Sequence, residues 1–398
     1  MYVVREIEIP FDKLTNMYPI IAVVGPRQTG KTTFLKKAVE GRNSSYVLFD
    51  DPDARTLFQN DIKKFQIQFI HEHGVSVLDE IQYCQEAGQK LKYLADTGNT
   101  VWITSSSEVI LAKDVLSYLV GRVSIVHLYP FSFPEFLKAK NIKAAGPDMV
   151  RRAIWEHMTY GGYPKVVLTN ELDVKKRIIF DLYQTMLYKD VSSSFNIEDI
   201  SSLEKLVRYL AVLKAPILNY NKLCKNLDMS FVTMKKYLAA MEKSYFITMV
   251  EPFFSNKSKE ITKQPKAYFI DTGMRNTVAK SFPSEPDGLL FENYVLTEMI
   301  KYGVKPKYWR TKSNAEVDFI IELGNEVIPV EVKLRAEPGR IERSMRAFIS
   351  YYKPKKAFVV AYKGESGVDD IEKCRVVTTD VPGLLDQLKQ MKLPEIPY

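Results

Sequence analysis

The chain has 398 residues, of which 46% are hydrophobic and 26% charged, and its formal net charge is +8. This length and composition predict two or three globular domains with buried cores. The three cysteines stand far apart, which argues against a disulfide framework or a zinc site and favours a reducing compartment. The N-terminus lacks the apolar core of a signal peptide, and no apolar run is long enough to span a membrane. We therefore expect a cytoplasmic protein.

Short apolar stretches alternate with helical stretches up to about residue 140, which is typical of a parallel α/β sheet. Because these stretches are apolar nearly throughout, we expect helices on both faces of the sheet. The turn Asp50-Asp51-Pro52 predicts a helix start after the second strand. The predicted strands are 19–24, 45–49, 75–79, 101–105 and 123–128.

The first strand leads into Gly25-Pro26-Arg27-Gln28-Thr29-Gly30-Lys31-Thr32, which fits the phosphate-loop pattern G-x-x-x-x-G-K-[ST] between a strand and a helix. In such a loop, backbone N–H groups and the helix N-terminus surround the β- and γ-phosphates of a nucleotide. Lys31 would add a positive charge there, and the Thr32 hydroxyl would bind Mg²⁺. Thr33 completes the predicted nucleoside triphosphate site.

The third strand ends in two carboxylates, Asp79 and Glu80. Roughly fifty residues after a phosphate loop, such a pair is typical of a nucleotide-hydrolysing site. Asp79 would hold Mg²⁺, directly or through water, and Glu80 would polarise the attacking water. The glutamate therefore predicts hydrolysis, and the absence of a guanine-selecting Asn-Lys-x-Asp sequence favours ATP.

Two further positions are candidates for sensing the γ-phosphate. Ser105 or Ser106, at the end of the fourth strand, is placed for this role; alternatively, the serines cap the next helix. Arg122, just before the fifth strand, could reach a phosphate from within the chain or from a neighbouring subunit, where such an arginine raises the rate by about 10³–10⁵. It could equally be a surface charge.

Residues 149–197 are predicted to be helices broken at Gly161-Gly162 that form a lid on the α/β domain. Residues 198–263 have the element order of a winged helix-turn-helix. Its helices are expected at 201–213, 219–227 and 231–244, the last capped by Ser230, and a β-hairpin follows. Residues 201–263 also hold eleven Lys/Arg against five Asp/Glu, so most of the net charge lies in one sixth of the chain.

In a winged helix, the third helix enters the major groove of DNA and the wing touches the backbone. The candidate phosphate contacts are Lys235, Lys236 and Lys243 on that helix and Lys257 and Lys259 on the wing. No arginine or paired Asn/Gln on the helix suits base reading, so we expect backbone contact with weak sequence selectivity. The alternative is a domain used only for packing against protein.

The last segment, 264–398, contains a predicted β-hairpin with strands at 315–322 and 327–333. Alternation places Glu331 and Lys333 on one face of the second strand, and Asp318 can face them from the first. The two carboxylates could hold Mg²⁺ through oxygen ligands, with the lysine at the attacking water or the phosphoryl group. Glu292, on a predicted helix over 290–300, is a candidate additional ligand.

These motifs, in this order, resemble a family of archaeal and bacterial AAA-type ATPases of unknown physiological role, over nearly the whole chain. The resemblance implies an N-terminal ATPase and a C-terminal domain of unknown function, and it names no substrate. Ser105 departs from the family pattern, which usually has glycine there. The stretches that carry the resemblance are the phosphate loop, 77–82, the serine-ended strand, 121–123, 130–136, 161–164, 188–190, 268–273 and 291–293.

The Asp…Glu-x-Lys pattern resembles the PD-(D/E)XK restriction-endonuclease-like superfamily, which implies a nuclease-like fold; such folds are also reused for binding. The sequence thus predicts an AAA-like P-loop NTPase of α/β class, with ATP and Mg²⁺ as cofactors. We expect DNA as a partner, and a homo-oligomer or a protein partner stays open. The alternative is a regulatory or signalling ATPase that recruits a protein through an inactive nuclease fold. The predicted domains are 1–148 (ATPase), 149–197 (lid), 198–263 (winged helix) and 264–398 (nuclease-like).

Overall fold

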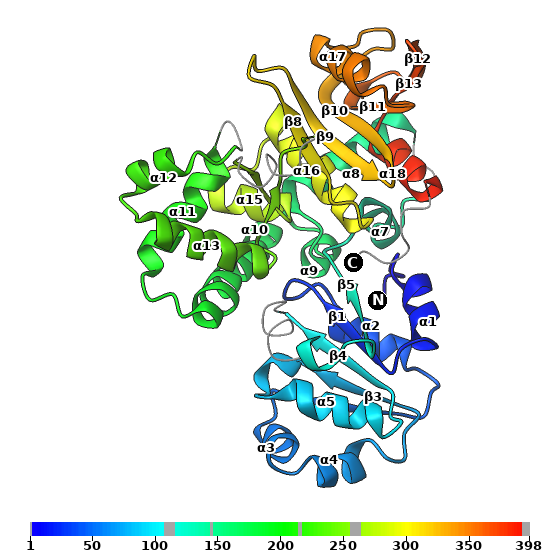
Figure 1. Cartoon of the computed structure of the whole chain (residues 1–398), viewed down its shortest axis with the longest axis vertical. Helices are drawn as coiled ribbons and strands as arrows, with labels where there is room; N and C mark the ends of the chain where they lie inside the picture. The colour runs from blue at the N-terminus through cyan, green and yellow to red at the C-terminus, as the bar shows by residue number, and fades with distance from the viewer. Residues whose placement is uncertain (1, 107–115, 144–145, 214–216, 255–263, 392–398) are drawn as a thin grey trace.

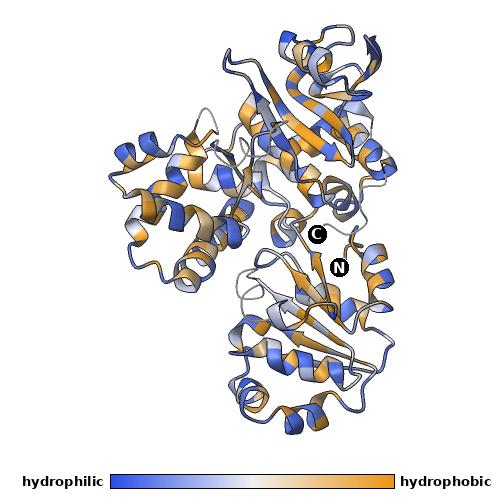
Figure 2. Cartoon of the chain, viewed as in Figure 1, coloured by the Kyte–Doolittle hydropathy of each residue, from blue (hydrophilic) through white to orange (hydrophobic). Residues whose placement is uncertain are grey.

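The computed structural model describes residues 2–106, 116–143, 146–213, 217–254 and 264–391. Figure 1 shows three parts: an α/β part at the N-terminus, a group of helices in the middle of the chain, and a second α/β part at the C-terminus. In the described ranges, no helix has the length and apolar character needed to cross a membrane. Figure 2 shows hydrophobic residues along the strands of both larger sheets and hydrophilic residues on the outer faces of the helices.

The N-terminal part contains β1 (Ile20–Val24), β2 (Ser44–Leu48), β3 (Val75–Asp79), β4 (Val101–Ser105) and β5 (Val123–His127). All five strands are parallel, in the order β2-β3-β4-β1-β5, and each lies within one residue of its predicted position. Every residue of β1, β3 and β4 is buried, because a parallel sheet is covered on both faces. The predicted α/β fold is confirmed.

Helices cover both faces of this sheet, as expected. On one face, the ring centroids of Phe11 of α1 and Trp102 of β4 lie 4.9 Å apart. On the other face, Phe58 and Phe65 of α3 and α4 pack around Phe49. The helices of this part are α1 (Glu8–Thr15), α2 (Lys31–Ala38), α3 (Pro52–Asn60), α4 (Ile62–Phe69) and α5 (Ala87–Asp96), with short 3₁₀ turns η1 (Ile81–Tyr83) and η2 (Leu116–Tyr118).

The next helices are α7 (Phe133–Ala139), α8 (Pro147–Tyr160), α9 (Pro164–Leu168) and α10 (Leu172–Thr185), then a π-helix, η3 (Met186–Ser192), and a 3₁₀ turn, η4 (Ser193–Phe195). The predicted break at Gly161-Gly162 is confirmed between α8 and α9. An added Cβ at Gly161 would lie 2.1 Å from the Asp271 carboxylate, and φ is +83° there, so this position requires glycine.

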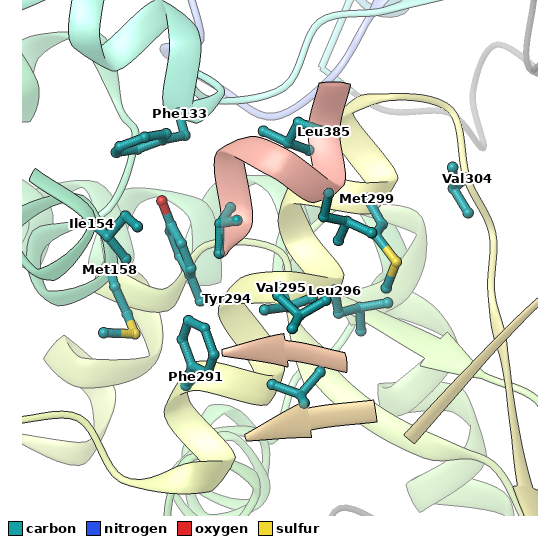
Figure 3. Packing of buried hydrophobic residues seen from close by; sticks show 14 of the residues in the cluster. Phe133, Ile154, Met158, Phe291, Tyr294, Val295, Leu296, Met299, Val304 and Leu385 are labelled. Atoms are coloured by element: carbon teal, nitrogen blue, oxygen red, sulfur yellow. The ribbon is translucent and has the colours of Figure 1, made fainter. Parts of the chain in front are cut away.

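The prediction of a lid that packs on the N-terminal sheet is wrong for α8. This helix packs against α15 (Thr272–Ala279) and α16 (Gly288–Lys301) in the C-terminal half. Figure 3 shows Ile154 and Met158 of α8 beside Phe291 and Tyr294 of α16, with Phe133 of α7 in the same cluster. The physical reason is that α16 is buried without a break from Leu290 to Met299, so it needs apolar partners on several sides.

The middle part contains α11 (Ile200–Val212), α12 (Tyr220–Leu227) and α13 (Phe231–Lys243), then the antiparallel strands β6 (Ile247–Val250) and β7 (Lys266–Phe269). This is the predicted order of elements. The predicted cap is also confirmed, because the Ser230 hydroxyl accepts a hydrogen bond from Thr233 N. The predicted wing lysines, Lys257 and Lys259, lie outside the described residues.

The C-terminal part contains β8 (Lys307–Arg310), β9 (Glu316–Leu323), β10 (Glu326–Ala336), α17 (Arg343–Tyr352), β11 (Lys356–Gly364), β12 (Gly367–Ile371), β13 (Cys374–Thr379) and α18 (Val381–Gln390). The strands form a mixed sheet in the order β12-β13-β11-β10-β9-β8, with β10, β11 and β13 parallel. Helices α16 and α18 cover one face and α17 the other. The predicted hairpin is confirmed as β9–β10, with Phe319 opposite Val330.

Candidate active site

The phosphate loop leaves the carboxyl end of β1 and leads directly into α2. At Gly25, φ is +148° and an added Cβ would lie 2.2 Å from the Leu128 carbonyl oxygen, so only glycine fits between the loop and the chain after β5. Gly30, at φ +96°, is the N-cap of α2. The loop and the N-terminus of α2 therefore have the arrangement that presents backbone N–H groups to an anion.

Lys31 lies folded against the loop. Its Nζ donates hydrogen bonds to the carbonyl oxygens of Gly25 and Pro26, both at 2.9 Å. The side chain is buried, and this burial lowers the pKa of Lys31 to about 8. The ammonium is thus held at the loop by neutral carbonyl groups, and an anion bound there would stabilise its charge.

Three hydroxyl groups fix the carboxylate of Asp79 at the end of β3. Thr32 Oγ1 donates to Asp79 Oδ2 at 2.7 Å, Tyr46 donates to the same oxygen, and Thr104 Oγ1 donates to Oδ1. Burial and the nearby Asp79 raise the pKa of Tyr46, so its hydroxyl stays a donor. Neighbouring hydroxyl and carboxylate oxygens are the ligands that Mg²⁺ prefers, so Thr32 and Asp79 fit the predicted metal site.

Glu80 follows in the left-handed conformation, with φ +61°. Its N–H donates to Thr104 Oγ1 at 2.8 Å. Its carboxylate accepts a hydrogen bond from Gln82 Nε2, and the same nitrogen donates to Ser106 Oγ at 3.1 Å. The structure therefore places the hydroxyl of Ser106 in the same network as Glu80.

Two arginines connect the loop to other parts of the chain. Arg27, predicted as a nucleotide-binding residue, makes a two-pronged ion pair with Asp190 of η3, with Nη2 2.9 Å from Oδ1 and Nε 3.0 Å from Oδ2. The Asp190 carbonyl oxygen in turn accepts from Ser244 Oγ at 2.7 Å, at the end of α13. Arg5, which the sequence did not single out, is buried and donates to the carbonyl oxygens of Thr29 and Tyr129.

Arg122 does not reach the loop of its own chain. It lies at the amino end of β5, whereas the loop follows the carboxyl end of β1. Its Nε pairs with Asp96 at 2.6 Å on the exposed surface. Arg122 and the loop therefore lie at opposite ends of the neighbouring strands β5 and β1, so the prediction that Arg122 senses a phosphate within its own chain is wrong. Its action on a neighbouring subunit stays a prediction.

The C-terminal hairpin brings Asp318 and Glu331 opposite each other, as expected. Asp318 Oδ2 accepts from Val332 N at 2.8 Å, and Glu331 Oε1 pairs with Lys333 Nζ at 2.8 Å. Burial and the charges of Glu292 and Glu331 raise the pKa of Asp318 well above its usual range, and burial also raises that of Glu331. Glu331 Oε2 is buried and has no hydrogen-bond partner in the described chain.

Glu292, predicted as an additional metal ligand, is instead bound by Tyr268 and Lys266. Its Oε1 accepts from Tyr268 and pairs with Lys266 Nζ at 3.1 Å, and Lys266 also lies 2.6 Å from Glu316 Oε1. Burial opposes the charge of Lys266, but Glu292, Asp318 and Glu316 outweigh it and raise its pKa. Over the described residues, no group of three or more His, Cys, Asp or Glu is arranged to hold a metal ion. No sequence pattern had singled out Lys266, the first residue of β7.

A pocket of about 390 Å³ opens beside Glu331 and Lys333. Its walls hold both basic and acidic side chains, among them Arg335, Arg340 and Glu342.

On α13, two of the predicted DNA contacts are already used within the chain. Lys235 Nζ lies 4.1 Å from the Tyr220 ring centroid, and Lys236 Nζ donates to the Asn196 carbonyl oxygen at 3.1 Å. Lys243, the third, is exposed.

Three family models match the chain. Residues 17–137 match the model described as an AAA domain, residues 151–285 match a domain of unknown function (DUF8612), and residues 287–379 match another domain of unknown function (DUF4143). The first match covers the five-stranded sheet and its loop. The boundary between the first two matches falls near the start of α8.

Two relatives that match most of the chain are each described as an uncharacterised protein. A protein of Haemophilus influenzae is 24% identical over 380 residues, which is 90% of this chain and 93% of that protein. A protein of Methanocaldococcus jannaschii is 27% identical over 364 residues, 86% of this chain and 80% of its own length. Among solved structures, a Walker-type ATPase of Pyrococcus abyssi matches with a TM-score of 0.46 and 13% identity over 69% of this chain and 96% of that one.

Proposed function

We propose that this chain, whose residues 17–137 form an AAA-type P-loop domain, binds ATP with Mg²⁺ and hydrolyses it to ADP and phosphate. The observation that carries the proposal is the meeting of three elements at one sheet edge. Lys31 lies at the loop, the oxygens of Thr32 and Asp79 lie 2.7 Å apart, and Glu80 follows directly. This is the set of groups needed to hold a nucleotide, its metal ion and a general base.

Each group has a separate task in this proposal. The loop and the N-terminus of α2 bind the β- and γ-phosphates, and Lys31 exchanges its carbonyl partners for phosphate oxygens. Thr32 and Asp79 would hold Mg²⁺, which, when bound, neutralises charge on the phosphate oxygens. Glu80 accepts the proton of the attacking water. The Ser106 hydroxyl is the candidate contact with the γ-phosphate.

Nucleotide affinity is expected to fall as pH rises above about 8, because Lys31 must be protonated to pair with phosphate and burial lowers its pKa to about 8 in the free protein. Above that pH, binding takes up a proton, so the Kd for a fluorescent ATP analogue should rise by about tenfold per pH unit. The nucleotide contributes no such change, since phosphate monoesters titrate near pH ~6. Fluorescence titrations from pH 7 to 10 measure the effect.

Lys31→Ala is the matching variant. Loss of a charged hydrogen-bond donor costs ~1.5–3 kcal/mol, so its Kd at pH 7 should rise about tenfold or more and stay flat above pH 8. Lys37→Ala, an exposed lysine of the same helix, is the control and should behave as wild type. An unchanged affinity of Lys31→Ala would contradict the assignment of the loop.

A second candidate function is Mg²⁺-dependent processing of DNA by the C-terminal half. It is favoured by Glu331 Oε2, a buried carboxylate oxygen without a partner in the described chain, beside Asp318 and Lys333. A metal ion bound by the two carboxylates would satisfy this oxygen. In this proposal residues 198–263 are a winged helix that binds DNA, and 264–398 are the nuclease-like domain.

The competing role is recruitment of a protein partner. It is favoured by the exposed apolar side chains at the start of α13, where Phe231 is 51% and Val232 76% exposed, and by the engagement of Lys235 and Lys236 within the chain. Under this alternative, the C-terminal carboxylates are a structural cluster without activity.

Plasmid cleavage separates the two roles. If the site is active, wild type nicks or cuts plasmid DNA with Mg²⁺ or Mn²⁺, and Asp318→Ala and Lys333→Ala each reduce the rate by about 10²-fold or more. Lys355→Ala, at an exposed lysine that does not line the pocket, is the control. Cleavage that survives both substitutions would contradict the site. DNA affinity that is absent even at low salt would favour the protein-recruiting role, since backbone binding to DNA strengthens steeply as salt falls.

A further inference from the structure

Gln82 lies two residues after Glu80, in the 3₁₀ turn η1. Its amide nitrogen donates to the carboxylate of Glu80 and, at 3.1 Å, to Ser106 Oγ. Among the residues that the structure describes, no other side chain donates a hydrogen bond to the Glu80 carboxylate. One side-chain amide therefore joins the proposed general base to the proposed γ-phosphate sensor.

The orientation of this amide is fixed by chemistry. A carboxylate only accepts hydrogen bonds, so the NH₂ side of Gln82 must face Glu80. Both N–H groups are then used, one on Glu80 and one on Ser106. Because Ser106 accepts from Gln82, its own O–H is available to donate to a phosphate oxygen.

The other end of the amide has no partner. Gln82 Oε1 is buried and accepts no hydrogen bond within the described chain. A buried acceptor left unpaired destabilises the folded protein, so its presence beside the proposed general base points to a ligand that supplies the missing donor. A phosphate oxygen cannot fill the position, since both atoms are acceptors. A water molecule can, because it donates.

We propose that Gln82 orients the attacking water together with Glu80. Its amide nitrogen holds the Glu80 carboxylate toward the water, and its carbonyl oxygen accepts the hydrogen that Glu80 does not take. This inference rests on the proposed hydrolysis of ATP and adds a residue to it. A glutamine performs a comparable task in small GTPases, where it orients the attacking water.

The Glu80 backbone supports this role. Its left-handed conformation and the hydrogen bond from its N–H to Thr104 Oγ1 fix where the side chain begins. The carboxylate at the other end is held by Gln82. Loss of the amide therefore leaves Glu80 anchored at its backbone but free to rotate about its side-chain bonds.

Gln82→Leu keeps most of the side-chain volume and removes the amide. We expect its kcat to fall by about 10–100-fold, which corresponds to the loss of one or two hydrogen bonds to a charged group. The Kd for the ATP analogue should stay within about twofold of wild type, because Gln82 contributes no contact to the loop. Gln85→Leu, an exposed glutamine of the same segment, is the control.

Gln82→Glu is the second variant and tests the contact itself. It keeps the length of the side chain but replaces the N–H donor by a second acceptor beside the Glu80 carboxylate, so its kcat should also fall by about tenfold or more at an unchanged Kd for the ATP analogue. A residue with a purely structural role would change the unfolding midpoint but leave kcat in place. Unchanged kcat in either variant would overturn the proposal.

Failure of this inference and failure of the proposed function give different results. If Glu80→Gln hydrolyses ATP as fast as wild type, the proposed general base is wrong, whatever Gln82 does. If Glu80→Gln is inactive and Gln82→Leu turns over like wild type, only the role of Gln82 is wrong. Thermal unfolding of both Gln82 variants shows that any loss of rate comes from folded protein.

Discussion

Glu80→Gln is expected to bind ATP like the wild type and to lose hydrolysis by about two orders of magnitude or more. The substitution keeps the size of the side chain and removes its ability to take a proton from water. Lys31 and the Thr32–Asp79 pair keep their hydrogen bonds, because none of these bonds is made with the Glu80 carboxylate. Single-turnover measurements of phosphate release, beside binding of a fluorescent ATP analogue, separate the two steps.

The matched control is Glu86→Gln, the same change at an exposed glutamate a few residues further along. It should hydrolyse ATP at the wild-type rate. Equal rates in Glu80→Gln and wild type would show that another group is the general base. Weaker ATP binding in Glu80→Gln would show that the carboxylate also holds the loop or the metal ion.

Lys266→Met is expected to lower the free energy of unfolding by about 3–5 kcal/mol, since it removes one partner of a buried ion cluster. Lys266 is 1% exposed, and its Nζ lies 3.1 Å from Glu292 and 2.6 Å from Glu316. Without the ammonium, Glu292 would be left close to Asp318 without the cation that pairs with it. Glu316 would keep Arg310, 3.5 Å away, as its partner. Urea unfolding at pH 8 measures the change.

The loss of stability in Lys266→Met is expected to depend on pH. Burial and neighbouring carboxylates already raise the pKa of Asp318, and loss of Lys266 raises it further. The energetic penalty of the buried charge is complete above the folded pKa of the carboxyl group, shrinks as pH falls below that value and vanishes below the unfolded pKa. The deficit of Lys266→Met should therefore be smaller at pH 5 than at pH 8.

A double variant, Lys266→Met with Glu292→Gln, removes a charge of each sign and should recover part of the lost stability. Lys355→Met, an exposed lysine paired with Glu326, is the control and should leave the unfolding transition essentially unchanged. An equal effect of the two lysine substitutions would contradict the role of the buried cluster.

Local patterns predicted much of this structure. The five strands of the N-terminal sheet were readable because each is a short apolar run bounded by turn residues. The Ser230 cap and the β9–β10 hairpin were readable from other local signals, namely a preferred N-cap residue and alternating strands around a turn. Helix α16 was predicted over 290–300, within its observed bounds. The spacing of the motifs identified the phosphate loop and the Asp79-Glu80 pair. Their proximity could also be predicted, because the carboxyl ends of parallel strands lie at the same edge of a sheet.

The contacts that no pattern predicted join residues far apart in the chain. An apolar helix face shows that a helix is packed, but not against what; α8 was therefore assigned to the N-terminal sheet, although it packs on α15 and α16. Lys266 offers no local sign of burial, because its three carboxylate partners stand 26 or more residues away. Gln82 was overlooked as an ordinary polar residue after the carboxylate pair.

The pair of Arg27 and Asp190 has a thermodynamic consequence. It joins a side chain of the phosphate loop to η3, and through the Asp190 carbonyl to Ser244 at the end of α13. If a nucleotide binds more tightly when the Arg27–Asp190 pair is formed, its binding stabilises the paired state by the free energy that corresponds to this difference in affinity. A macromolecule that binds the middle helices and favours one state of the pair therefore changes the affinity for ATP. By reciprocity, ATP changes the affinity for that macromolecule by the same factor. Asp190→Asn, which weakens the pair without removing the side chain, would set that factor closer to one.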